Sequence, residues 1–177
     1  GITHKLELED EPIPQGFFNI DKTALEKNYW TGDEPDTPLE GVKFELRDKD
    51  DNVLMELVTD KYGKFSEDII LEKGTYYLWE TEAPEHYIKS DKPDVFEITE
   101  NGQKVTIDIK NKVEVAGFVD VSKVASKDNE ITGEQKDTYI PNAKYRIENI
   151  DTEEVVAELI TTEQGYLEEK LMLGAGN

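Results

Sequence analysis

Lys22, Glu80 and Asn111 carry side chains that could react with one another, and each ends a segment in which apolar residues occupy alternate positions. The segments are 18–22, 76–80 and 105–111. Side chains two residues apart on a β-strand point to the same face of the sheet. All three polar side chains are therefore predicted to point into a core, where lysine and glutamate are seldom found unless they are paired.

Burial of these three groups together would favour an amide bond between Lys22 and Asn111. Desolvation lowers the pKa of a lysine amine and raises the pKa of a glutamic acid, so Lys22 would be a neutral nucleophile and Glu80 a protonated acid. The acid could hydrogen-bond the oxygen of the Asn111 carboxamide, polarise it and transfer protons as ammonia leaves. The product would be an isopeptide bond, formed in a single turnover of the chain on itself.

The alternation alone leaves ordinary roles open for each residue. Lys22 could be an edge residue whose stem packs against the core while its amine reaches solvent. Lys22 and Glu80 could form a partly buried ion pair, and Asn111 could be a turn residue at the end of a strand.

The elements that must position these residues are short β-strands. Apolar residues alternate with polar ones in further segments as well, at 42–46 and 53–57, in addition to 105–109 within the segment named above. Turn signals rich in glycine, proline, aspartate and asparagine separate them, at 31–35, 48–52, 62–63, 73–74 and 101–102. Short strands with this spacing predict an all-β fold, a β-sandwich.

An internal repeat indicates two modules whose equivalent residues lie roughly a hundred positions apart, a usual domain size. Segments 20–24, 38–46, 56–65 and 68–74 resemble 121–125, 139–147, 158–167 and 170–176. Residues 15–112 are predicted to form a complete module, and residues 113–177 the N-terminal part of a second, truncated one. Residues 1–14 would be a lead or the remnant of a preceding module. Lys123 takes the position of Lys22 in the second copy, whose acid and amide partners would lie beyond Asn177.

Charge and composition argue against several classes of function. The 177 residues carry a net charge of −21 and no cysteine. A surface so acidic would be repelled by nucleic acid and by anionic membranes, and no apolar run reaches the roughly 18 residues of a membrane helix. Without cysteine there can be no disulfide and no thiolate zinc site. Nucleic-acid binding and membrane insertion are therefore not expected.

No metal, cofactor or turnover site is expected either. Asp48, Asp50 and Asn52 are spaced like the start of a calcium loop, but the glycine and glutamate that such a loop needs are missing. His4 and His86 are isolated in sequence from any serine or aspartate that could complete a catalytic triad.

The segment Gly74–Tyr87, GTYYLWETEAPEHY, resembles the G-x-Y-x-L-x-E-x-x-A-P-x-x-Y stretch of Cna protein B-type domains, known as the E-box in Gram-positive pilins. Three further segments resemble the family's L-x-G-A-x-F-x-L strand, its closing strand ending in asparagine and its opening strand with a reactive lysine: 39–46, 107–112 and 20–24. The sequence departs from the family at His86, where glycine is usual. The resemblance covers residues 16–112 fully and 113–177 as an incomplete copy.

The resemblance implies prealbumin-like, reverse-immunoglobulin β-sandwich modules in tandem, with a Lys–Asn isopeptide bond promoted by a glutamate. If the family's roles apply to this chain, Lys22 supplies the amine of the isopeptide bond, Asn111 is the acceptor and Glu80 is the catalyst. Glu82, expected on the same face as Glu80, is the second candidate for the catalyst. No cofactor is implied.

The same resemblance implies a non-enzymatic structural stalk or shaft module of an adhesin or pilin, located outside the cell at the cell wall. Its partners would be neighbouring modules of the same polypeptide and, through other domains, a host matrix protein. The alternative is an adhesin segment that itself binds a host extracellular-matrix ligand. An exposed apolar groove would favour that alternative.

Overall fold

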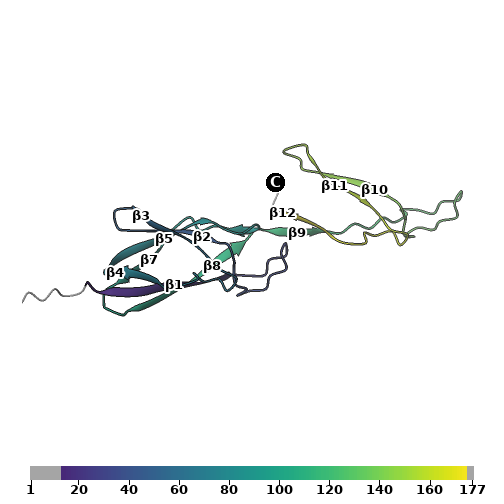
Figure 1. The fold of residues 1–177 in the computed structure, drawn as a ribbon. Helices are drawn as coiled ribbons and strands as arrows, with labels where there is room; N and C mark the ends of the chain where they lie inside the picture. The colour runs from purple at the N-terminus through teal and green to yellow at the C-terminus, as the bar shows by residue number, and fades with distance from the viewer. Residues whose placement is uncertain (1–12, 175–177) are drawn as a thin grey trace, which may run out of the picture. The chain divides into compact units, whose positions relative to one another are not determined.

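The computed structural model describes residues 13–174, which form twelve β-strands (Figure 1). Over this range there is no helix that could span a membrane. The chain divides into two compact units, Gly1–Val113 and Glu114–Asn177.

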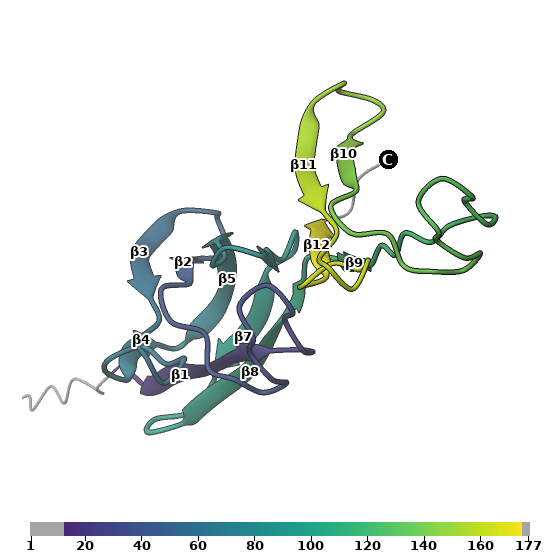
Figure 2. The same cartoon turned by 90° about the vertical axis from the view of Figure 1, so that its right-hand side faces the viewer.

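The first unit consists of two four-stranded sheets, with strand orders β4-β1-β8-β6 and β3-β2-β5-β7. The first sheet contains β1 (Gln15–Ala24), β4 (Ile69–Glu72), β6 (Tyr87–Ile88) and β8 (Lys104–Val113). The second contains β2 (Lys43–Arg47), β3 (Val53–Val58), β5 (Gly74–Glu82) and β7 (Asp94–Ile98). The first and last strands, β1 and β8, lie side by side and are parallel, whereas the other pairs of this unit are antiparallel (Figure 2).

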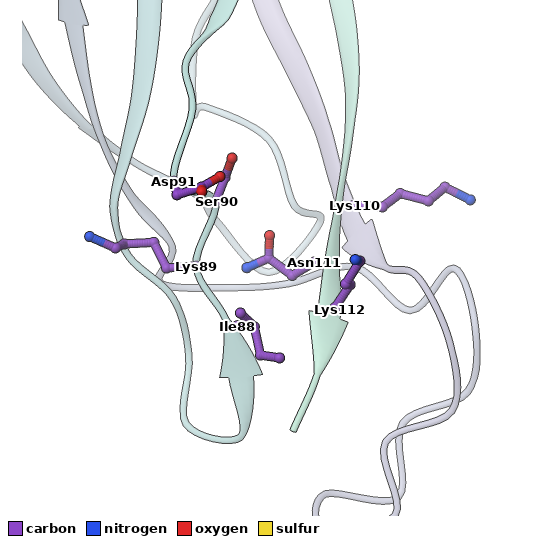
Figure 3. A pocket seen from close by; sticks show the side chains of 7 residues that line it. All are labelled: Ile88, Lys89, Ser90, Asp91, Lys110, Asn111 and Lys112. Atoms are coloured by element: carbon purple, nitrogen blue, oxygen red, sulfur yellow. The ribbon is translucent and has the colours of Figure 1, made fainter. Parts of the chain in front are cut away.

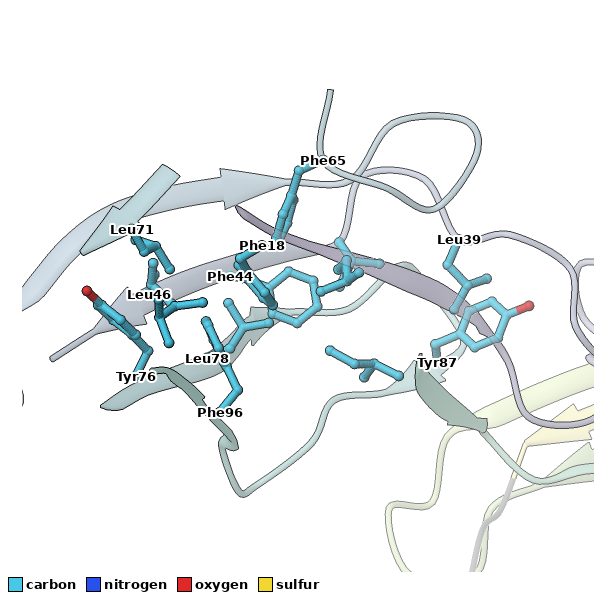
Figure 4. Close-up of a cluster of buried hydrophobic side chains, with 14 of the residues drawn as sticks. Phe18, Leu39, Phe44, Leu46, Phe65, Leu71, Tyr76, Leu78, Tyr87 and Phe96 are labelled. Carbon is cyan, nitrogen blue, oxygen red and sulfur yellow. The ribbon is translucent and has the colours of Figure 1, made fainter. Parts of the chain in front are cut away.

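A core of apolar side chains joins the two sheets (Figure 4). Phe18 of β1 stacks on Phe96 of β7 with ring centroids 4.0 Å apart, and Phe65 packs edge-on against Phe44 of β2. Inward and outward side chains alternate along β1, as the period of two in the sequence predicted. The predicted all-β sandwich is therefore confirmed for the first unit.

The backbone of Lys22 is fixed by the loop before β4 and the segment before β2. Its N–H donates to the carbonyl of Gly63 at 2.8 Å, and its carbonyl accepts from the N–H of Leu39 at 2.9 Å. Gly63 has a φ of 72°, and a Cβ there would overlap the Lys22 carbonyl oxygen. Only glycine fits both the left-handed conformation and this close approach.

The turn before β6 shows why glycine is usual at position 86 and how histidine is accommodated. His86 has a φ of 63°, a region that glycine enters at little cost. Its imidazole stacks on the Trp30 ring, with centroids 4.7 Å apart and planes inclined by 14°. The buried side chain of Asn28 donates to the His86 carbonyl at 3.3 Å. These contacts hold the turn in place although its residue is not glycine.

The second unit contains two antiparallel strand pairs. They are β9 (Ala116–Val119) with β12 (Leu171–Gly174), and β10 (Lys144–Glu148) with β11 (Val155–Ile160). The backbone of Lys123 is held like that of Lys22, since its N–H donates to Gly165 at 2.8 Å and its carbonyl accepts from Ile140 at 2.8 Å. The equivalent positions of the repeat therefore fold alike.

The inner face of the second unit is less covered than that of the first. Phe44 and Leu46 of β2 are buried, whereas Tyr145 and Ile147, their equivalents on β10, are only half-buried. In the first unit β5 and β7 complete this sheet, and the described residues after Val113 include no such strands. A sheet face of this kind is usually stabilised by packing against a second layer.

Candidate isopeptide site

Lys22, Glu80 and Asn111 meet inside the first unit. Their exposed fractions are 0%, 4% and 2%. The Lys22 amine donates to Glu80 Oε2 at 3.1 Å and also contacts the Asn111 side-chain oxygen. Asn111 Nδ2 donates to Glu80 Oε1 at 2.6 Å. Each of the three side chains thus touches the other two, out of contact with solvent.

The strand register explains how the three residues reach one point. In the parallel pair, Lys22 lies opposite Ile109 and Ala24 lies opposite Asn111, so the lysine and the asparagine are diagonal neighbours on the inner face. Glu80 comes from β5 in the facing sheet, where it pairs with Phe44. The acid therefore reaches across the core to both reacting groups.

Burial and charge act in opposite directions on the Lys22 amine. Desolvation is the larger effect and lowers the pKa of Lys22, while the Glu80 carboxylate and, more weakly, Asp94 raise it. The amine also lies 5.7 Å from the centre of the Phe44 ring. A lower pKa makes the neutral, nucleophilic amine easier to reach than it would be in water.

The orientation of the Asn111 carboxamide differs from the one expected from the sequence. The Glu80 acid was expected on the amide oxygen, but Glu80 contacts the amide nitrogen, and the oxygen faces the Lys22 amine. In this orientation Glu80 lies beside the nitrogen that would leave. It is placed to deliver a proton to that nitrogen, which makes ammonia a better leaving group than an amide anion.

Glu82 lies outside this cluster, contrary to the expectation that it shares the face of Glu80. The β2–β5 register shifts at Lys43, which pairs with Glu82 while the next residue pairs with Glu80. This irregularity turns Glu82 to the surface, where its carboxylate bonds Lys43 Nζ at 2.7 Å. Glu80 is therefore the carboxyl in contact with Lys22 and Asn111. In the second unit, Lys123 is exposed.

Asp94 is a second carboxyl near the site that the sequence argument missed. It is half-buried at the start of β7, directly opposite Leu78. Burial raises the pKa of Asp94, the Lys22 charge lowers it and Glu80 raises it again. The signal was present in the sequence, because Asp94 alternates with Phe96 and Ile98, both of which are buried.

A cavity of about 430 Å³ adjoins Asn111 (Figure 3). Its lining residues are Ile88, Lys89, Ser90, Asp91, Lys110, Asn111 and Lys112. The N–H of Ser90 donates to Glu80 Oε2 at 3.4 Å, so this segment also borders the acid. The cavity therefore borders both the residue that would accept the amine and the segment next to the acid. Over residues 13–174, no cluster of three or more histidines and acids could hold a metal ion.

Solved structures with the same fold include proteins of Bacillus. The TIE protein of Bacillus anthracis is 26% identical with a TM-score of 0.52, over 92% of this chain and 27% of that one. BcpA, the major pilin subunit of Bacillus cereus, is 22% identical with a TM-score of 0.50, over 60% of this chain and 31% of that one. A variant of BcpA is 22% identical with a TM-score of 0.51, over 75% of this chain and 36% of that one. The chain thus spans only about a third of their length.

No curated protein is similar to this sequence. A family model does match it: residues 27–113 correspond to the SpaA family, described as a prealbumin-like fold domain. The match includes Glu80 and Asn111 and begins after Lys22. It agrees with the resemblance to pilin domains and with the sandwich of the first unit. Residues 27–113 therefore match the SpaA family of prealbumin-like domains.

Proposed function

We propose that the first unit is a structural stalk module of a cell-surface adhesin or pilin, closed by an amide bond between Lys22 and Asn111. The observation that carries this proposal is the enclosed contact among the Lys22 amine, the Asn111 carboxamide and the Glu80 carboxyl. The match of residues 27–113 to the SpaA family and the likeness to a major pilin support a location at the cell surface.

The proposed reaction needs only these three side chains. A proton passes from the Lys22 ammonium to the Glu80 carboxylate, and the neutral amine attacks Cγ of Asn111. The bond from Cγ to Nδ2 then breaks, and Glu80 transfers its proton to the departing nitrogen. The attacking nitrogen loses a further proton, so the products are one secondary amide and one ammonium ion. The ion can leave through the cavity beside Asn111.

The position of the bond suits a module that carries tension. Lys22 and Asn111 lie 89 positions apart in sequence but on adjacent parallel strands. A pull on the two ends of the module would pass from β1 through the amide to β8. The intervening residues would be shielded from force, and no enzyme or cofactor would be needed to maintain the link.

Intact mass spectrometry tests the cross-link directly. The wild-type chain is expected to be lighter than its sequence mass by one ammonia, because one amide nitrogen is lost for each bond formed. The Asn111→Ala chain should show its full calculated mass, and Lys123→Ala should still lack one ammonia. Peptide mapping should place the link between Lys22 and Asn111. A wild-type chain of full mass, folded as judged by circular dichroism, would refute the bond.

We further propose that residues 113–177 are the N-terminal part of a second module of this kind, with Lys123 as its reactive lysine. Two observations support this. The backbone contacts of Lys123 repeat those of Lys22, and the inner face of β10 is only half-buried. The strands that would cover this face, and the acid and amide that would meet Lys123, correspond to β5 through β8 of the first unit.

A chimeric chain tests this second proposal. In the repeat, Asn177 corresponds to Thr75, so a copy of residues 76–113 would be joined after Asn177. This chain is expected to lack two ammonias, because the added strands bring a second glutamate and asparagine to Lys123. The same chimera with Lys123→Ala should lack only one. If the chimera shows the added β-structure by circular dichroism but still lacks only one ammonia, Lys123 does not have this role.

A further inference from the structure

Proton transfer at the buried site poses a problem that the three contacting residues do not solve by themselves. Lys22, Glu80 and Asn111 are almost fully enclosed, and the amine is paired with Glu80 at 3.1 Å. That pairing stabilises the ammonium form, which cannot attack a carbonyl carbon. Glu80 must also release its proton at the right moment to the leaving nitrogen. A second group that exchanges protons with solvent would relieve this conflict.

Asp94 occupies the place where such a group is needed. It lies opposite the fully buried Leu78 in the β5–β7 pair, and cross-strand partners share a sheet face. Glu80 is two residues farther along β5, which makes the two acids diagonal neighbours at about 7–8 Å between their Cα atoms. Unlike Glu80, Asp94 is only half-buried. It therefore shares the face of the enclosed cluster, is close enough to act on the charges of Lys22 and Glu80, and is still in contact with solvent.

We propose that Asp94 is a positioning residue for amide formation: its carboxylate draws one proton from the Lys22–Glu80 pair and passes it to solvent. This inference rests on the proposed cross-link. In the starting state Lys22 is protonated and both acids are ionised. One proton moves through Glu80 to Asp94 and on to water, which leaves a neutral amine that can attack. Glu80 then takes a second proton from the attacking nitrogen and delivers it to Nδ2 of Asn111, as the bond from Cγ to Nδ2 breaks and ammonia leaves. No oxidant or other reactant is required, and Asp94 acts through Glu80 without touching the bond that forms.

The charges that face Asp94 define its expected pH dependence. They are the Lys22 amine from β1 and the Glu80 carboxyl from β5. Burial raises the pKa of Asp94, and its carboxylate is the active form. The rate of amide formation should therefore fall as the pH drops through that raised pKa. Removing the carboxylate should slow the reaction. It should also abolish this fall in rate at low pH, the acid limb of the pH profile.

The test follows bond formation in newly made full-length chain. The protein is labelled in a short pulse of cell-free translation, translation is stopped, and the chain is moved to buffers between about pH 5 and about pH 9. The linked fraction is then counted over time by intact mass. Asp94→Asn is expected to slow linking about tenfold or more near neutral pH and to flatten the acid limb, because general acid–base groups contribute large factors. Asp94→Glu should restore most of the rate and the limb.

Three results would overturn the inference. One is an Asp94→Asn chain that links within about twofold of the wild-type rate at every pH, since a tenfold loss is expected. Another is an equal slowing at every pH without rescue by Asp94→Glu, which would assign Asp94 a purely structural role. A wild-type chain that never loses ammonia would refute the cross-link itself. Near-UV circular dichroism on each variant confirms that the first unit has folded.

Discussion

The Glu80→Ala chain is expected to keep its full mass and to be far less stable than the wild type. Two losses combine in this variant. Without the acid the amide does not form, and closing a loop of this length stabilises a protein by about 4–5 kcal/mol. Lys22 also loses its buried partner, which costs about 3 kcal/mol or more. Guanidinium unfolding followed by tryptophan fluorescence measures the total, and intact mass reports the bond.

Two matched variants separate these contributions. Asn111→Ala removes the bond but retains the Lys22–Glu80 pair, so its free energy of unfolding should lie between those of the wild type and Glu80→Ala. Glu82→Ala removes a neighbouring acid whose only described ion pair is at the surface, with Lys43. It should still lose one ammonia and change stability by less than about 1 kcal/mol. If Glu80→Ala links fully, Glu80 is not the acid, whatever its effect on stability.

The Gly63→Ala chain is expected to lose at least about 3 kcal/mol of stability and to link slowly or incompletely. The added methyl group would overlap the carbonyl oxygen of Lys22, and the left-handed backbone adds its own strain. Relief requires β1 or the loop before β4 to move, which displaces the lysine from Asn111. Thermal unfolding and the linked fraction by mass measure the two effects.

Gly41→Ala is the control for the conformational part of this effect. Gly41 has a φ of 77°, close to that of Gly63, but nothing lies within 4 Å of a Cβ built there. It should lose only about 1 kcal/mol and link normally. Equal losses in the two variants would mean that backbone conformation, and not contact with Lys22, makes glycine necessary at position 63.

The alternation of residue types predicted the strands that carry Lys22, Glu80 and Asn111 and that these three side chains point inward. Phe18, Ile20 and Lys22 are all fully buried along β1, although lysine is rarely a core residue. The reason is that a period of two is a property of the backbone, which holds whatever side chain occupies the position. The resemblance to known domains then indicated which distant strands meet.

The alternation failed where the backbone departs from a regular strand or where geometry depends on partners across the core. Glu82 left the inner face because the β2–β5 register shifts beside it. The orientation of the Asn111 carboxamide depends on Glu80 and Lys22, which no local pattern describes. Asp94 was missed because its segment was not recognised as a strand, although its alternation with Phe96 is regular. The misses at Glu82 and Asn111 concern strand register and tertiary packing, whereas the miss at Asp94 concerns an unrecognised strand.

An amide between the adjacent parallel strands β1 and β8 would also limit how far the first module can lengthen under force. An unlinked module that unfolded would release the 89 positions between Lys22 and Asn111, roughly 300 Å of extended chain. With the amide in place, the residues between Lys22 and Asn111 form a covalently closed ring that cannot be extended. Only the short segments outside the ring can then lengthen. A tether built from such modules would hold a nearly constant length up to the force that ruptures a covalent bond.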